Sequence, residues 1–269
     1  MAVRTRRRSN PEGRMSLGQH LVELRRRVFW AAGAVVVGTG GGWFLYDLVW
    51  PQLESPIQHI AKSHQAIINF TNITGAFDLR VQIAFTIGIV VSSPVWLYQI
   101  FAFLVPALSR REKRYVLAFI GTAIPLFLIG CAVGWIVFPH MIELMSSFVP
   151  AGSASFYDAK YYLDFVLKLV LVVGFAFELP VFLVLLNFVG VLRGKAILKG
   201  WRWAVLAIVV FTAIATPAAD ISSMMLLALP MTVLYFVAIG ISLLHDRQVD
   251  RRKAAEELAS SASVDATPA

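Results

Sequence analysis

The sequence alternates between long apolar runs and shorter polar segments, many of them basic. Six of the runs approach the roughly 20 residues that a helix needs to cross a hydrocarbon layer about 30 Å thick. They cover residues 28–49, 79–100, 115–138, 163–187, 203–217 and 222–244. This pattern predicts an all-α membrane protein with six transmembrane helices.

Two of the runs have features that bear on their shape. The run at 79–100 contains Pro94, which removes a backbone donor and therefore predicts a kink. The run at 203–217 is short, so a helix there rises only about 22 Å, less than the hydrocarbon thickness. We therefore expect the connection that follows it, with Asp220, to lie submerged on the outer side of the membrane.

Polar segments set the limits of the membrane domain, which we place at residues 15–245. Residues 1–14 form a basic arm and residues 246–269 a polar tail, and both are poor in large apolar side chains. We expect both to be disordered, because they cannot bury enough apolar surface to become ordered. Residues 50–78, which include Pro56, form an outer segment between the first two spans, and we expect it to be a loop.

The distribution of charge indicates the orientation of the chain. The chain has 269 residues, of which 58% are apolar, and a net charge of +8. Most of its Lys and Arg residues fall in four clusters, at 1–27, 110–114, 193–202 and 247–253. If six spans alternate in direction, all four clusters lie on one side, which is the positive-inside pattern. We therefore expect both termini in the cytoplasm and no nucleic-acid partner.

Few residues offer catalytic chemistry or metal binding. The sequence contains no Gly-rich phosphate-binding loop and no paired-histidine zinc motif. The single cysteine, Cys131, lies within the third run, and the five histidines are dispersed without ligand spacing. We expect no enzyme activity, no metal and no cofactor.

One acidic residue lies deep in an apolar run. Glu178 is about 15 residues into the run at 163–187, where a charge costs at least about 2.5 kcal/mol. It shares a helix face with Asp164 and Lys168, and Pro180 follows it closely, which predicts a bend beside the carboxylate. Three uses remain open for Glu178: a structural hydrogen bond within the bundle, a proton or ion carrier, or a docking point for a polar group on another helix.

Two further acids lie in basic patches beside the membrane. Residues 16–28 have helical periodicity and predict an interfacial helix that carries Glu23. Glu112 lies in the basic segment "SRREKR". Because Arg26 and Arg27 follow Glu23 at helical spacing, Glu23 is also compatible with a solvated ion pair worth a few tenths of a kcal/mol.

Four stretches, in order along the chain, resemble the TatC family, the polytopic subunits of the twin-arginine protein translocase. They are "HLVELRRR" at 20–27, "SSPVWLYQIFAFLVPALSRREKR" at 92–114, "FELPVFLVLL" at 177–186 and "TPAADISSMMLLALP" at 216–230. The resemblance implies a six-span, concave, glove-like bundle in the bacterial plasma membrane. It also implies that the chain recognises the twin-arginine signal peptides of folded cargo at its cytoplasmic face.

The resemblance further implies roles for individual residues. Signal-peptide contacts are expected at Glu23, Arg25, Phe103 and Glu112. Docking of a helper subunit is expected at Glu178 and Met224, and the contact at Met224 is expected to be apolar, where many relatives carry glutamine. A structural or assembly role is expected for Pro56, Pro94, Pro180 and Asp220.

The expected partners follow from the same resemblance. They are TatA- and TatB-type single-span subunits, twin-arginine signal peptides, membrane lipid and further copies of the chain in a receptor complex. Since no nucleotide-binding motif is present, we expect the proton motive force to drive export. The alternative hypothesis is an ion-coupled small-molecule carrier that uses Glu178. An intramembrane enzyme would need a second polar catalytic group at that depth, and the sequence offers no obvious one.

Overall fold

The computed structural model describes residues 17–64, 67–104, 113–150, 156–216 and 221–265. Within these ranges the chain forms helices and two short strands. In chain order they are α1 (Leu17–His64), β1 (Ile67–Asn69), α2 (Gly75–Val91), α3 (Ser93–Leu104), α4 (Lys113–Ser147), β2 (Phe156–Asp158), α5 (Ala159–Phe188), α6 (Gly194–Lys199), α7 (Trp201–Ala215) and α8 (Ile221–Asp265).

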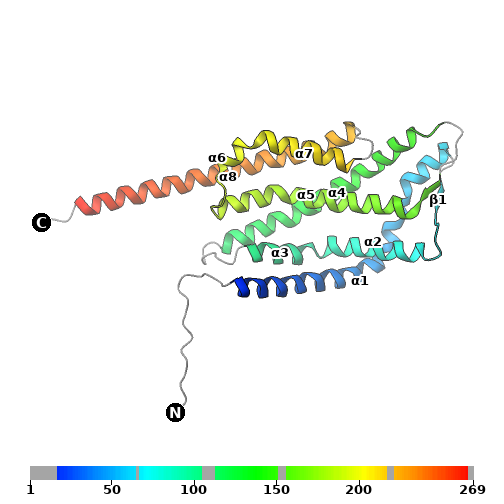
Figure 1. Cartoon of the computed structure of the whole chain (residues 1–269), viewed down its shortest axis with the longest axis horizontal. Helices are drawn as coiled ribbons and strands as arrows, with labels where there is room; N and C mark the ends of the chain where they lie inside the picture. The colour runs from blue at the N-terminus through cyan, green and yellow to red at the C-terminus, as the bar shows by residue number, and fades with distance from the viewer. Residues whose placement is uncertain (1–16, 65–66, 105–112, 151–155, 217–220, 266–269) are drawn as a thin grey trace, which may run out of the picture.

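The long helices lie side by side in one bundle, with α4 and α5 between the pair α1 and α2–α3 and the pair α7 and α8 (Figure 1). The start of α1, the end of α3, the start of α4 and the far end of α8 all lie at one end of the bundle. We call this end the N-terminal rim. The strand β1 lies at the opposite end. The basic residues of α1, α6 and α8 therefore gather at the N-terminal rim, as the charge pattern predicts.

The prediction of an all-α membrane protein is confirmed in its main feature. Four helices are long and apolar enough to cross a membrane, and the bent pair α2–α3 can supply a fifth crossing. The remaining apolar helix, α7, has 15 residues. A sixth crossing by this helix stays a prediction, because its rise is about 22 Å.

The kink expected near Pro94 is confirmed. α2 and α3 are bent by 56° at Ser92. Pro94 lies in the first turn of α3, where its missing N–H is tolerated, whereas within a continuous helix it would disrupt the preceding turn. The Ser92 carbonyl accepts the N–H groups of Val95 and Trp96, and the Trp96 indole Nε1 donates to the carbonyl of Ile89 at 2.9 Å. These bonds satisfy the backbone across the break.

The expected loop at 50–78 is partly wrong, because α1 continues as a helix as far as His64. The continuation contains Pro56, which is buried together with Leu53 and Ile57. These three residues have the spacing of a single helix face, and that face packs into the core. The Tyr162 hydroxyl of α5 donates to the Leu53 carbonyl at 2.6 Å, which ties the extension to the bundle.

The end of the bundle opposite the N-terminal rim also contains a small parallel sheet that the sequence pattern did not predict. β1 pairs with β2, with Asn69 opposite Asp158. Asp158 caps α5 by accepting the N–H groups of Lys160 and Tyr161, and it accepts the Thr71 hydroxyl at 2.8 Å. These hydrogen bonds, that from Thr71 foremost, lower the pKa of the Asp158 carboxyl below its ordinary value.

The expectation of a disordered tail is also wrong for most of its length, since α8 runs on to Asp265. The segment "RRKAAEELA" at 251–259 is exposed, so tertiary packing does not hold it in place. It is rich in strong helix formers, and it extends a helix that the apolar part of α8 has already nucleated. The arm at 1–14, Glu112 and Asp220 lie outside the described residues.

Glycines allow α1 and α2 to approach closely. A Cβ added at Gly38 would lie 2.7 Å from the Gly88 carbonyl oxygen, and one added at Gly88 would lie 2.6 Å from the main-chain nitrogen of Thr39. Small residues of this kind let two helix backbones meet within a membrane. The same device recurs between α4 and α5 at Gly130 and Gly174.

We predict that Gly38→Ala lowers the free energy of unfolding by about 1–3 kcal/mol, because the new methyl group overlaps backbone atoms of α2. The matched control is Gly40→Ala on the same helix, where an added Cβ meets no atom within 4 Å. Thermal unfolding in detergent measures both variants. Equal stability of the two would contradict the close approach of α1 and α2.

Candidate functional site

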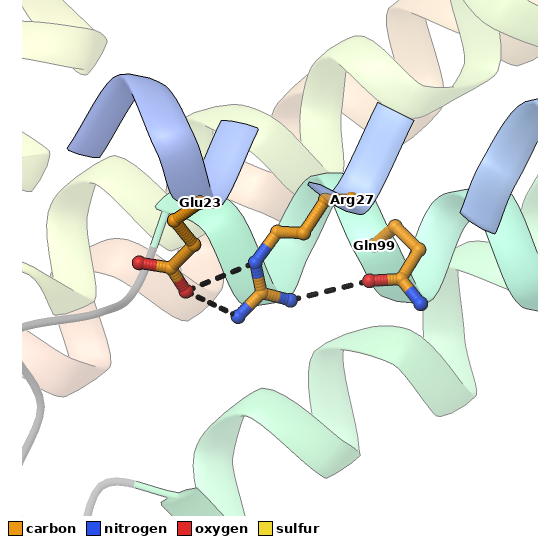
Figure 2. Close-up of polar contacts among 3 residues, drawn as sticks. All are labelled: Glu23, Arg27 and Gln99. Carbon is orange, nitrogen blue, oxygen red and sulfur yellow. Dashed lines mark hydrogen bonds and ion pairs between the residues drawn. The ribbon is translucent and has the colours of Figure 1, made fainter. Parts of the chain in front are cut away.

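The N-terminal rim holds a polar cluster between α1 and α3, which we call the rim site: His20, Glu23, Arg27, Gln99 and Phe103. Figure 2 shows Glu23, Arg27 and Gln99 in a row. Glu23 Oε1 accepts two bonds from the Arg27 guanidinium, from Nε at 3.0 Å and from Nη2 at 2.6 Å. Arg27 Nη1 donates to Gln99 Oε1 at 3.3 Å. One guanidinium group thus links a carboxylate on α1 to an amide on α3.

Among the described residues, only one of the two carboxylate oxygens of Glu23 accepts a hydrogen bond. Its side chain and that of Arg27 are each 22% exposed. The second oxygen, Oε2, is shielded from solvent and has no hydrogen-bond partner among the described residues. Carboxylates accept up to about four hydrogen bonds, so Glu23 retains unused acceptor capacity.

An aromatic contact closes the rim site one turn earlier on α1. The rings of His20 and Phe103 stack with their centroids 4.4 Å apart and their planes inclined by 19°. His20 precedes Glu23 by three residues, so both side chains lie on the α1 face that meets α3. The structure therefore brings Glu23 and Phe103 to one seam.

Arg25 lies on a different face of α1. It lines a surface pocket of about 580 Å³ with Arg26, Phe29 and Trp30, and its side chain is exposed. A two-residue offset turns a side chain about 200° around a helix, which explains why Arg25 is separated from Glu23. Although Glu112 lies outside the described residues, the ends of α3 and α4 that flank its segment lie at the N-terminal rim (Figure 1).

A second acidic position lies in the interior of the bundle. Glu178 of α5 is only 5% exposed, and neither carboxyl oxygen has a hydrogen-bond partner among the described residues. The main chain of Phe127 lies beside the carboxyl group without the geometry of a hydrogen bond. Such a buried unpaired carboxyl group destabilises the fold by about 1–3 kcal/mol.

Aromatic rings surround this part of α5. Phe175, one turn before Glu178, packs against Trp96 of α3 and Phe127 of α4, with ring centroids 5.3 and 5.4 Å away. Phe182, one turn after Glu178, packs against Phe101 at 5.6 Å. We call Trp96, Phe101, Phe127, Phe175 and Phe182 the aromatic cluster. Two of its members, Phe175 and Phe182, flank Glu178 on α5, and none of these rings can accept or donate a hydrogen bond to a carboxylate except through the Trp96 indole, which is bonded to Ile89.

Asp164 and Lys168, the residues predicted to share a face of α5 with Glu178, lie near the start of this helix. Asp164 accepts a bond from Lys168 Nζ at 2.8 Å and a short bond from the side chain of Gln82 on α2. Asp164 is therefore paired, whereas Glu178 on the same helix is not. The contrast indicates that the bundle satisfies its own polar groups near the end of α5 that Asp158 caps.

The other predicted site residues lie apart from these two positions. Met224 is half-buried in the first turn of α8, and none of the described contacts joins it to Glu178. Pro180 is buried within a continuous α5 and lines an apolar pocket of about 350 Å³ between α4, α5 and α8. Beside Glu178, the side chains of Phe175 and Leu179 are 46% and 60% exposed, so uncovered apolar surface adjoins the acid.

The sequence analysis missed the contribution of Gln99. The spacing of Glu23 and Arg27 signalled an ion pair, but no sequence pattern showed that α3 would supply a third member. Gln99, a lone amide within an apolar stretch, was the available signal. Within the described residues, no three His, Cys, Asp or Glu side chains gather as metal ligands.

Comparisons with known proteins give a consistent result. Residues 19–230 match the family model described as Sec-independent protein translocase protein (TatC). The chain is 46% identical over 244 residues to the Sec-independent protein translocase protein TatC of Xylanimonas cellulosilytica, covering 90% of this chain and 88% of the relative. It is 32% identical to TatCy of Bacillus subtilis, covering 92% and 96% of the two chains.

Solved structures give the same result for the fold. A crystal structure of the twin arginine translocase receptor TatC in DDM superposes with a TM-score of 0.68 at 28% identity, covering 83% of this chain and 99% of that one. A second crystal structure of the receptor gives a TM-score of 0.68 at 29% identity, covering 84% and 98%.

We predict that Glu178→Leu raises the free energy of unfolding of the isolated chain by about 1–3 kcal/mol, because it replaces an unpaired buried carboxyl group with an apolar side chain. The control is Glu143→Leu on α4, where the acid is exposed. Thermal unfolding of the purified chain in detergent measures both. A loss of stability in Glu178→Leu would show that the carboxyl group has a stabilising partner.

Proposed function

The chain belongs to the TatC family, the multi-pass membrane subunits of the twin-arginine translocase, and from this premise we propose that it is the receptor that binds twin-arginine signal peptides at the cytoplasmic face. Members of this family are translocase components and not enzymes. The chain then assembles with TatA- and TatB-type single-span subunits and exports folded cargo, driven by the proton motive force.

The proposed topology has six crossings, with both termini in the cytoplasm of a bacterium. The basic clusters on α1, α6 and α8 support it, because they lie at one end of the bundle (Figure 1). In this topology the N-terminal rim faces the cytoplasm, where signal peptides arrive. α7 is the sixth span, and its 15 residues require a locally thinned bilayer or a submerged connection to α8.

The observation that carries the proposal is the guanidinium group that Glu23 already holds. Both contacts to Oε1 come from one arginine, and they are charge-assisted hydrogen bonds. A carboxylate in this setting discriminates arginine from lysine by fork geometry, since an ammonium group cannot present two parallel donors. The rim site therefore has the chemistry needed to bind an arginine of a signal peptide.

Two adjacent arginines call for two acids. Glu112 is the proposed partner of the second guanidinium, and Phe103 and Arg25 complete the peptide-binding surface. Support for Glu112 comes from the helix ends that flank its segment, which lie at the N-terminal rim (Figure 1). Phe103 stacks on His20 within the rim site and offers an apolar face beside Glu23.

Glu178 is the proposed docking point for a helper helix. A polar group on that helix would supply the hydrogen bond that the bundle leaves unmade at Glu178. The exposed Phe175 and Leu179 would provide the apolar contact surface, and a rotation of the glutamate side chain would bring the carboxyl group to it. Met224 would add an apolar contact from α8, and membrane lipid and further copies of the chain would complete the receptor complex.

The carrier hypothesis gains no support from the interior of the bundle. An ion or proton pathway needs a chain of polar groups around the acid. Among the described residues, Glu178 has no hydrogen-bond partner, and its helix neighbours Phe175 and Phe182 belong to the aromatic cluster.

We predict that Glu23→Ala weakens binding of a twin-arginine signal peptide about 10- to 100-fold, the loss expected for hydrogen bonds to a charged group. Glu112→Ala should have an effect of similar size, whereas the exposed Glu143, which lies near the other end of α4, supplies the control Glu143→Ala. Peptide affinity in nanodiscs and export of folded cargo in cells are the two measurements. Normal binding and export in both rim variants would refute the assigned roles.

We predict that Glu178→Leu sheds the single-span helper subunits during purification in mild detergent but retains the signal peptide. Unfolding cannot explain this result if the isolated variant is as stable as expected above. Glu178→Gln serves as the matched variant, because its amide keeps hydrogen-bonding capacity and should retain part of the helper. Full helper retention by Glu178→Leu would remove the docking role.

A further inference from the structure

The guanidinium of Arg27 occupies the position that a signal-peptide arginine would need. It donates two bonds to Glu23 Oε1 and a third to Gln99 Oε1, so it is held from two helices. The other oxygen of Glu23, Oε2, is shielded from solvent by its surroundings. While Arg27 stays in place, Oε1 of Glu23 therefore already holds a guanidinium group, and Oε2 is shielded from solvent.

We propose that Arg27 is a resident competitor at the rim site, so that recognition of the signal peptide is an exchange of one guanidinium group for another at Glu23. The inference rests on the proposed function and adds a specificity-determining pair, Arg27 and Gln99. Gln99 Oε1 accepts a bond from Arg27 Nη1 in this position and so helps to hold the guanidinium group at Glu23.

The exchange lowers the affinity of the chain for a peptide with a single arginine. The bond that the peptide forms with Glu23 is of the same kind as the bond that Arg27 gives up, so part of the gain at this acid is lost. A second arginine at a second acid makes up that loss. A resident competitor thus converts affinity for arginine in general into selectivity for paired arginines, which is a form of negative selection against single-arginine sequences.

Of the three consecutive arginines of α1, Arg25 to Arg27, the geometry gives the role of competitor only to Arg27. Arg25 and Arg26 line the exposed pocket with Phe29 and Trp30 on another face of α1. Arg26 therefore provides a matched control, because Arg26→Gln removes the same charge from the same helix without freeing Glu23. Any effect of net charge on insertion or on peptide attraction is shared by Arg26→Gln and Arg27→Gln.

The test compares the affinities of the full-length chain in nanodiscs for three signal peptides that differ only in the paired positions: Arg-Arg, Arg-Lys and Lys-Arg. A Lys-Lys peptide serves as the reference for the receptor function itself. We expect Arg27→Gln to bind at least one single-arginine peptide about fivefold more tightly than the wild type, the gain expected when a partly exposed competing ion pair is removed. Its preference for Arg-Arg over that peptide should fall, and Arg26→Gln should match the wild type.

Two further variants separate competition from a structural role. Gln99→Leu keeps the Glu23–Arg27 pair but removes one anchor of the guanidinium, so it should shift single-arginine affinity in the same direction by a smaller factor. Arg27→Lys leaves a cation without the fork and should lie between Arg27→Gln and the wild type. If Arg27 had only a structural role, Arg27→Gln would instead lower the unfolding temperature of the chain and weaken the binding of all three peptides together.

The outcomes distinguish this inference from the proposed function. If the wild type prefers Arg-Arg, but folded Arg27→Gln binds single-arginine peptides no better, the competitor role is overturned and the receptor function stands. If the wild type shows no preference for Arg-Arg over a Lys-Lys peptide, the receptor function fails and the competitor role fails with it.

Discussion

A carboxylate that is shielded from water needs a hydrogen-bond or ion-pair partner, and the structure supplies one to Glu23 but not to Glu178 among the described residues. At the N-terminal rim, Glu23 shares a guanidinium group with Gln99, so its charge is paired across two helices. In the interior, Glu178 lies next to an aromatic cluster that offers it no hydrogen bond. In the function proposed above, the paired acid exchanges one guanidinium group for another, and the unpaired acid receives a hydrogen bond from another chain.

Close helix packing holds these acids in position. The glycines of α1 and α2 bring the two backbones together, and the break at Ser92 turns α3 so that Gln99 and Phe103 meet α1 at the rim. The bonds around Ser92 and the indole of Trp96 satisfy the backbone at the break. The same indole ring contacts Phe127 and Phe175 in the aromatic cluster. The bend between α2 and α3 therefore connects the rim geometry to the environment of Glu178.

Much of the fold could be predicted from the sequence, because apolar runs, basic clusters and Pro94 each affect structure within a short stretch of chain. The membrane class and the bend were predicted in this way, whereas the resemblance to TatC rested on four specific sequence stretches. The continuation of α1 to His64 was missed because residues 50–78 lie between two apolar runs and were taken as a loop, whereas Leu53 and Pro56 are buried on one face of a helix. The helical tail was missed because a polar composition with few large apolar side chains was taken to mean disorder. Gln99 could not be assigned, since its contact with Arg27 spans 72 residues of sequence.

The central claim is that a carboxylate at the rim holds a guanidinium group of the signal peptide. Solid-state NMR tests it most directly, with ¹⁵N-labelled arginine in the peptide and ¹³C-labelled glutamate in the chain. The account predicts peptide guanidinium nitrogens in ion-pair contact with glutamate carboxyl carbons, and predicts that Glu23→Gln removes the contact to residue 23 and leaves the contact to Glu112. A bound peptide whose arginines contact no glutamate carboxyl group, or an unchanged set of contacts in Glu23→Gln, would contradict it.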